Sequence, residues 1–187
     1  MKPVSPIPVL ETERLRLRPF TLADEPAVFA LASDPEIARF VRFEAHTTPA
    51  DTRAFLELAF EHYHHGDPFA WAIVLREEGR LIGSCGFVSQ AIERRSAEIG
   101  YWLGKPYWGR GYAVEAAQAL VRFGFERMGL ERVEAKCFLE NRASQRVIEK
   151  LGMKLEGTDC SEMIKGKYPE LRVYGIARHD WERAETH

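Results

Sequence analysis

The sequence predicts a single mixed α/β (α+β) domain, in which a mixed sheet carries helices on both faces. Three observations predict this fold class. The chain has 187 residues, of which 45% are hydrophobic, and this length is typical of one domain with a sizeable core. Short apolar segments in the middle of the chain are separated by turn residues, as in antiparallel hairpins. A strand–helix–strand pattern over residues 97–139 indicates a parallel crossover.

The first third of the chain predicts one strand and two capped helices. Leucines alternate with arginines over residues 13–20, which is typical of a half-exposed strand. Thr21 begins a helix with Asp24 at its third position, as in a capping box, and Pro35 ends it. Thr48 caps a second helix. Its helical spacing is expected to place four residues on one side, namely Phe55, Leu58, Ala59 and Tyr63.

The rest of the chain predicts alternating strands and helices. Strands are expected at 69–76, 81–88, 97–103, 133–139, 154–163 and 171–177, and helices at 111–128 and 141–151. Gly152 follows the last of these helices and suits a left-handed cap. The long helix is expected to turn its polar side to solvent, with Glu115, Gln118, Arg122 and Glu126.

Composition and charge narrow the class of protein. With 26 basic and 28 acidic residues the formal net charge is -2, and the chain lacks the broad basic field of a nucleic-acid-binding protein. No apolar run approaches the length of a membrane helix, and the stretch from Met1 to Leu10 has three prolines and no apolar core of signal-peptide length. The three cysteines are far apart and form no CxxC pair, so no metal site is expected. We expect a cytoplasmic protein with reduced thiols.

The most informative stretch runs from Glu98 to Ala116, where a strand leads into a glycine-rich loop and then a long helix. Gly109 and Gly111 let backbone N–H groups approach an anion closely, and the helix N-terminus adds a partial positive charge. No Lys-Ser/Thr follows, and no third glycine completes a dinucleotide-binding motif. The loop therefore predicts a diphosphate cradle, and a strand-to-helix turn that binds nothing is the alternative.

These residues resemble the GNAT N-acetyltransferase superfamily. Its acetyl-CoA motif is similar to residues 108–113, with Trp108 in place of the usual Gln or Arg. Residues 100–103 and 108–116 resemble the branch that acetylates the N-terminal alanine or serine of ribosomal proteins. Residues 141–153 match a second motif of that branch, and residues 11–20 resemble its opening strand. The resemblance implies one GNAT domain over 10–181, with an irregular lead-in at 1–9 and a C-terminal tail at 182–187.

The resemblance also implies how the donor, acetyl-CoA, is bound. The sheet would be mostly antiparallel, with the strands at 99–103 and 133–138 forming a parallel pair that splays apart at a bulge, for which Gly100 is suited. The pantetheine arm would enter that gap, and the pyrophosphate would rest on the loop. The expected cofactor-binding residues are Tyr101, Trp102, Leu103, Trp108, Gly109, Arg110, Gly111, Tyr112, Ala113, Asn141 and Ser144. Asn141 could equally be a plain helix cap.

The implied reaction is direct attack of a primary amine on the acetyl thioester. Glu98 is the first candidate for the general base, through a water if needed, and Glu134 is the second. Either could instead be an ordinary strand carboxylate or a salt-bridge partner. Many family members carry a tyrosine that protonates the thiolate, but Ile148 stands at that position. Ser144 is the expected substitute, with a locally bonded helix serine as the alternative.

The acceptor is predicted only as a class. It would be a protein N-terminal α-amine or a small-molecule amine, and weak candidates for its site are Phe43, Glu44, His46 and Tyr168. A non-catalytic module that binds or senses CoA is the alternative function. The histidines beside Tyr63 are interpreted as a solvated helix end. Neither a nucleic acid nor a membrane is an expected partner, and a homodimer is possible.

Overall fold

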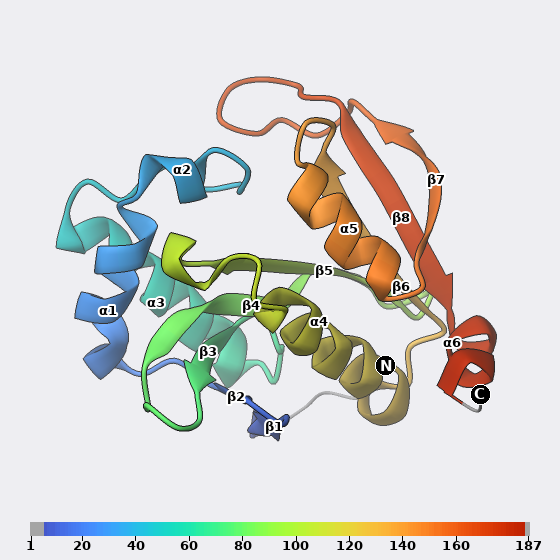
Figure 1. Cartoon of the computed structure of the whole chain (residues 1–187), viewed down its shortest axis with the longest axis horizontal. Helices are drawn as coiled ribbons and strands as arrows, with labels where there is room; N and C mark the ends of the chain where they lie inside the picture. The colour runs from blue at the N-terminus through green and yellow to red at the C-terminus, as the bar shows by residue number, and fades with distance from the viewer. Residues whose placement is uncertain (1–5, 186–187) are drawn as a thin grey trace.

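The computed structural model describes residues 6–185. The predicted tail therefore falls partly outside the described residues, as does most of the lead-in. Eight strands form one sheet in the order β1-β2-β3-β4-β5-β6-β8-β7 (Figure 1). The strands are β1 (Leu10–Glu11), β2 (Leu15–Arg18), β3 (Trp71–Leu75), β4 (Leu81–Ala91), β5 (Ser96–Leu103), β6 (Arg132–Phe138), β7 (Lys154–Asp159) and β8 (Leu171–Ala177). Within the described chain β5 and β6 run parallel and every other neighbouring pair is antiparallel, which confirms the predicted mixed sheet.

Helices cover both faces of this sheet, as predicted. They are α1 (Glu25–Ala32), α2 (Pro35–Ala38), α3 (Pro49–His64), α4 (Tyr112–Phe123), α5 (Arg142–Lys150) and α6 (Arg178–Glu185), and α4 continues as a π-helical turn over Gly124–Met128. One apolar cluster joins α4 and α5 to one face, and a second joins α1 and α3 to the other. The sequence did not predict β1, the short α2 or α6. Residues 182–185 of the expected tail belong to α6.

The predicted helix starts are present. Thr21 and Asp24 form a capping box, although the first turn is a 3-10 turn that leads into α1. Thr48 and Asp51 form a second capping box at the start of α3. The predicted side of α3 needs a correction, because Leu56 is buried and Leu58 is exposed. Leu58 lines a cavity beside the sheet instead of joining the core.

The parallel strand pair splays apart. Its ladder runs from Ser96–Arg132 to Ile99–Ala135 and then stops. Beyond that point β5 continues to Leu103 paired only with β4, and β6 continues to Phe138 paired only with β8. The two strands therefore leave a gap lined by backbone groups that have no strand partner on that side.

The bulge that accompanies the splay lies elsewhere than Gly100. The β4–β5 register shifts between Phe87 and Ser89, so the additional residue is Val88 of β4. A Cβ on Gly100 would lie 2.8 Å from the Val88 side chain. Gly100 is therefore needed because the bulged neighbour fills the space above it, and the bulge itself turns β4 and β5 away from β6.

Candidate active site

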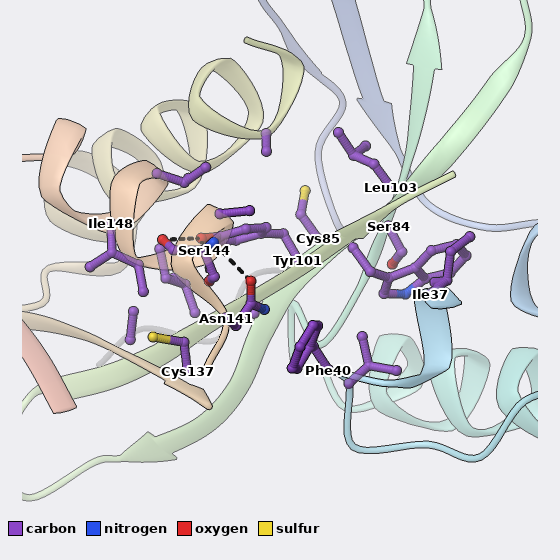
Figure 2. A pocket seen from close by; sticks show the side chains of 18 of the residues that line it. Ile37, Phe40, Ser84, Cys85, Tyr101, Leu103, Cys137, Asn141, Ser144 and Ile148 are labelled. Atoms are coloured by element: carbon purple, nitrogen blue, oxygen red, sulfur yellow. Dashed lines mark hydrogen bonds between the residues drawn. The ribbon is translucent and has the colours of Figure 1, made fainter. Parts of the chain in front are cut away.

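A cavity of about 800 Å³ opens at the splay and reaches both faces of the sheet (Figure 2). The cavity reaches both faces because side chains of β5 point alternately to one face and the other. Ile99 and Leu103 join the core under α4, whereas Trp102 joins the cluster under α1 and α3. The donor loop and α5 line one part of the cavity. The segment that contains α2 and the residues after it lines the other part. Predicted donor residues that line it are Tyr101, Trp102, Leu103, Trp108, Gly109, Gly111, Tyr112, Ala113, Asn141 and Ser144.

The cradle for an anion is built from backbone. Gly109 and Gly111 have φ values of 72° and 82°, a left-handed conformation that suits glycine. Gly111 is the N-cap of α4, whose first helical bond runs from the Glu115 N–H to the Gly111 carbonyl at 3.1 Å. The N–H groups of residues 111–114 therefore have no partner within the helix, and they add to its positive end. The loop therefore presents free N–H groups and a positive helix end, which suit an anion.

An ion pair from the N-terminal hairpin holds the cradle in place. Glu115 accepts hydrogen bonds from the Thr12 hydroxyl at 2.6 Å and from the Arg14 backbone and guanidinium at 2.8 and 2.7 Å. Arg14 also donates to the carbonyl of Arg110 at 3.0 Å and stacks over the ring of Tyr112 at 4.5 Å. Burial alone would raise the pKa of Glu115, but these hydrogen bonds outweigh it and lower that pKa.

The Arg14–Glu115 contact corrects the expectation for Glu115, and it identifies Arg14 as a residue of the loop's surroundings that the sequence did not predict. Glu115 was expected to face solvent, and it is instead partly buried against Arg14. Arg14 lies about a hundred residues away from Glu115, so spacing gave no signal of the pair. Arg110, which was expected among the donor residues, does not line the cavity, and the structure uses its carbonyl to anchor Arg14.

Trp108 closes the loop against the strand. Its indole N–H donates to the Leu103 carbonyl at 2.8 Å, and the ring remains partly exposed at the cavity. The residue that departs from the usual motif therefore fixes the loop relative to the end of β5. It also takes up one of the two acceptor positions of the Leu103 carbonyl.

Ser144 lies at the start of α5 and faces the splay (Figure 2). Asn141 is the N-cap of this helix, and its side-chain oxygen accepts from the Ser144 N–H at 3.0 Å. Asn141 also lines the cavity, so the cap leaves it beside the donor space. The Ser144 hydroxyl lies 2.9 Å from the hydroxyl of Tyr101. Ile148 is 1% exposed and offers no polar atom to the site.

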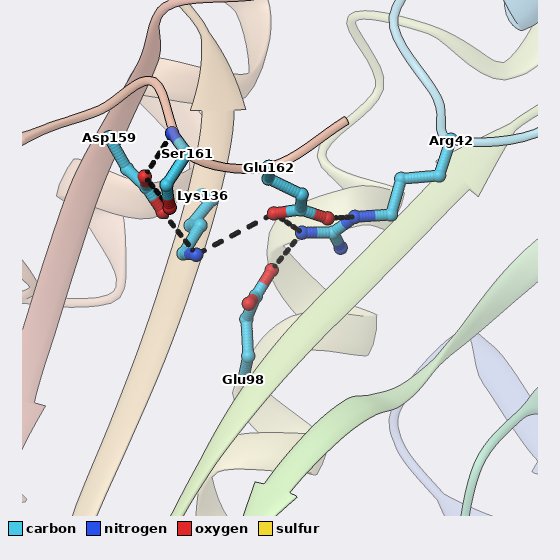
Figure 3. A network of polar contacts seen from close by, with 6 residues as sticks. All are labelled: Arg42, Glu98, Lys136, Asp159, Ser161 and Glu162. Carbon is cyan, nitrogen blue, oxygen red and sulfur yellow. Dashed lines mark hydrogen bonds and ion pairs between the residues drawn. The ribbon is translucent and has the colours of Figure 1, made fainter. Parts of the chain in front are cut away.

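Glu98 belongs to an ionic network on the acceptor side of β5 (Figure 3). Its carboxylate is 6% exposed and accepts from Arg42 at 2.7 Å. Arg42 also donates to Glu162 at 2.7 Å. Lys136 pairs with Asp159 at 2.7 Å and lies 3.6 Å from Glu162. The network thus connects the segment after α2, the two splayed strands and the loop between β7 and β8.

The acidic members of this network keep Arg42 charged. Burial would lower the pKa of Arg42, but hydrogen bonds and the charges of Glu98 and Glu162 outweigh it and raise that pKa. Arg42 and Lys136 line the cavity, whereas Glu98 does not.

Aromatic side chains form the acceptor side of the cavity. Phe43 packs edge-on against Trp102 with 5.7 Å between ring centroids, and Phe40 packs against Phe138 at 6.0 Å. Of the four weak acceptor candidates only Phe43 lines the cavity. His46 is buried and lies 2.8 Å from the Thr52 hydroxyl, and the other two candidates, Glu44 and Tyr168, are exposed.

The histidines at the end of α3 and the possibility of a metal site or a membrane-spanning helix can also be compared with the described residues. The ring of His62 bonds Asp67 at 2.6 Å and stacks on Phe69 at 4.4 Å, so it is part of the helix end. Within residues 6–185, no group of three or more His, Cys, Asp or Glu side chains is placed so that it could hold a metal ion. None of the described helices combines the length and the apolar composition that crossing a membrane requires.

A splayed parallel strand pair that ends beside a backbone anion cradle is the arrangement of an acyltransferase that takes its acyl group from a coenzyme A thioester. The family model described as "Acetyltransferase (GNAT) domain" matches residues 14–154, and the chain belongs to the GNAT acetyltransferase family. It is an N-acetyltransferase in class, and its cosubstrate is acetyl-CoA.

Several similar proteins agree with this assignment. An uncharacterized N-acetyltransferase of Bacillus subtilis, YoaA, is 34% identical over 172 residues, covering 91% of this chain and 97% of its own. The crystal structure of a GNAT-family acetyltransferase from Bacillus anthracis has a TM-score of 0.81 at 31% identity, covering 92% and 99% of the two chains. A ribosomal L7/L12 α-N-protein acetyltransferase in complex with coenzyme A has the same fold, with a TM-score of 0.81 at 22% identity and coverage of 91% and 98%.

Proposed function

We propose that this protein transfers the acetyl group of acetyl-CoA to a primary amine, either a protein N-terminal α-amine or the amine of a small molecule. One observation carries the proposal: the β5–β6 ladder stops at Ile99 and Ala135, and the gap beyond it leads to the glycine cradle. A thioester between the parting strands is reached from the α2 side by an acceptor. The resemblance of residues 100–116 to the ribosomal-protein branch favours an α-amine.

The transfer is direct. Burial raises the pKa of the Cys137 thiol to about 11, and it also raises the pKa of Cys85. Both thiols are therefore protonated at neutral pH and are poor nucleophiles. An acyl-cysteine intermediate is disfavoured on this ground, and the acceptor amine attacks the thioester carbonyl itself.

Two side chains assist this reaction in the proposal. Glu98 accepts the amine proton through a water, and Arg42 holds its carboxylate in place through a hydrogen bond to Oε1. An α-amine has a pKa of about 8, so it releases that proton more easily than a lysine does. Ser144 donates a hydrogen bond to the sulfur as the carbon–sulfur bond breaks, because its hydroxyl is at the start of α5 facing the splay.

The test combines binding and turnover. Calorimetry with acetyl-CoA is expected to show saturable binding, and release of free CoA is then measured with N-terminal peptides, small amines and an N-blocked lysine peptide. Faster turnover of α-amines than of lysine supports the proposal. Ser144→Ala is expected to bind acetyl-CoA normally and to lose about 10²-fold in kcat. Tight binding with no turnover of any amine would instead identify a CoA-sensing module.

A further inference from the structure

The Ser144 hydroxyl meets a second hydroxyl at the splay. The Tyr101 hydroxyl is 2.9 Å from it and 3.3 Å from the Ser144 carbonyl (Figure 2). Both residues line the cavity in which the thioester of the donor would lie.

Tyr101 comes from a different element than Ser144. It stands on β5 just beyond the last rung of the parallel ladder, and its side chain points to α5 across the gap. Burial raises the pKa of Tyr101, so its hydroxyl keeps its proton at neutral pH. A protonated phenol needs an acceptor, and the acceptors that the described residues place within hydrogen-bond reach both belong to Ser144.

The direction of the hydroxyl–hydroxyl bond decides what Ser144 can do. A serine hydroxyl has one proton. If it were donated to Tyr101, none would remain for a leaving sulfur. The hydroxyl of Ser144 is the nearer acceptor for the Tyr101 proton, at 2.9 Å against 3.3 Å for the carbonyl. With Tyr101 as the donor, the Ser144 proton is free to point to the sulfur.

We propose that Tyr101 is a positioning residue for departure of the thiolate: its hydroxyl donates to Ser144 Oγ and thereby commits the Ser144 proton to the sulfur that leaves. This inference rests on the proposed function. Tyr101 supplies from β5 the phenol that the sequence lacks at Ile148 on α5.

The atoms balance without a proton from Tyr101. The amine nitrogen forms a bond to the carbonyl carbon, the carbon–sulfur bond breaks, and the electron pair stays on sulfur. The ammonium first loses one proton to Glu98 through water, the attacking nitrogen loses a second proton to solvent as the amide forms, and the sulfur gains one proton from solvent. Ser144 and Tyr101 end as they began, with their hydrogen bonds strongest while the sulfur carries negative charge.

The experiment is a double-mutant cycle on the rate of acetyl transfer. Y101F, S144A and the double variant are compared in single-turnover reactions, so that product release does not mask the chemical step. Removing a hydrogen bond that acts on a developing charge predicts a loss of about tenfold in the rate constant of Y101F, with acetyl-CoA affinity changed by less than about twofold. The double variant is expected to be no slower than S144A, because Tyr101 acts only through Ser144.

A matched control separates this role from loss of a buried hydroxyl. Tyr63 donates to the Ala70 carbonyl at 2.6 Å and does not line the cavity. Y63F is expected to lower the melting temperature without changing the rate constant. A wild-type rate in Y101F, or losses in Y101F and S144A that multiply in the double variant, would overturn the inference. Absence of turnover in the wild-type protein with every amine would overturn the proposed function itself, and the two failures are therefore distinguishable.

Discussion

Glu98 and Glu134 face each other across the parallel strand pair, and each is bonded to an arginine. Their surroundings differ. Glu98 is 6% exposed and bonds Arg42 on the cavity wall, whereas Glu134 bonds Arg132, its neighbour on the same strand, and is partly exposed. At the scale of single residues the two carboxylates therefore differ in burial and in partner, and the choice of Glu98 as the base stays a prediction.

Glu98→Gln tests this assignment. The amide oxygen can still accept from Arg42, which also keeps its bond to Glu162, so the protein is expected to fold, but the group can no longer take up a proton. We expect kcat to fall by about 10- to 100-fold. Glu134→Gln is the matched control and should keep the wild-type kcat. Equal losses in the two variants would rule out a specific role for Glu98.

Asp24 provides a pH dependence of stability. Burial would raise its pKa, but hydrogen bonds from Arg18 at 2.7 and 2.6 Å and from the Thr21 backbone outweigh it and lower that pKa below 3.8. A lowered pKa contributes stability above the unfolded pKa, and this contribution is lost as pH falls through the folded value. Asp24→Asn should be less stable by about 1–3 kcal/mol at pH 7, since it breaks a charged, largely buried pair.

The measurement is urea unfolding of the wild-type protein and the Asp24→Asn variant between pH 7 and pH 2. The difference in the free energy of unfolding is expected to be constant down to about pH 4 and to shrink below it. Glu11→Gln, which alters the exposed pair with Arg16, should show little difference at any pH. A difference that grows toward low pH would contradict the assigned sign.

At the scale of elements, the start of α4 combines a left-handed backbone conformation with the proposed anion site. Gly111 holds a φ of 82°, and a Cβ there would lie 3.3 Å from the guanidinium of Arg14. Gly79, in the turn between β3 and β4, has a φ of 63° with no atom near the position of a Cβ. The two glycines share the backbone conformation, but only Gly111 belongs to the cradle.

Gly111→Ala is expected to destabilise the protein by about 1–2 kcal/mol and to weaken acetyl-CoA binding by about tenfold, because the loop relaxes away from its anion-binding shape. Gly79→Ala should cause a similar loss of stability with unchanged affinity. Calorimetry measures the acetyl-CoA affinity of both variants, and urea unfolding measures their free energy of unfolding. Unchanged affinity in Gly111→Ala would show that the cradle does not depend on this residue.

At the scale of the whole molecule, Arg42 connects segments that the sequence separates widely. It bonds Glu98 on β5 and Glu162 in the β7–β8 loop, so three distant segments meet over the splay. Arg42→Met should lower the free energy of unfolding by about 1–2 kcal/mol, a value discounted because the guanidinium is partly exposed. It should also raise the KM for the acceptor, since the aromatic wall beside it loses its anchor.

Arg16→Met is the control for this prediction. Its pair with Glu11 is exposed on both sides, with 55% and 47% of the side chains accessible, and such pairs contribute little. Urea unfolding and steady-state kinetics with the best acceptor test both variants. If Arg42→Met matched Arg16→Met in stability and in KM, the network would be a surface feature with no effect on the acceptor side.

The sequence by itself determined most of the elements and the place of the glycine-rich loop. Strand alternation, capping residues and glycine position are local signals, because backbone conformation depends mainly on neighbouring residues. These signals placed the mixed sheet, the helix starts at Thr21 and Thr48 and the cradle at Gly109 and Gly111, and the resemblance added the splay. The bounds of most elements were predicted to within a few residues.

Only the tertiary structure decided which distant side chains meet. It placed the bulge at Val88, paired Arg14 with Glu115, and brought the Tyr101 hydroxyl to Ser144. Each contact joins elements brought together by strand order and helix packing, and a hydrogen bond needs its two atoms within about 3 Å. Local sequence patterns do not specify the distance between residues that are far apart in the chain. For this reason the contacts that define the chemistry of the site can be identified only in the folded chain.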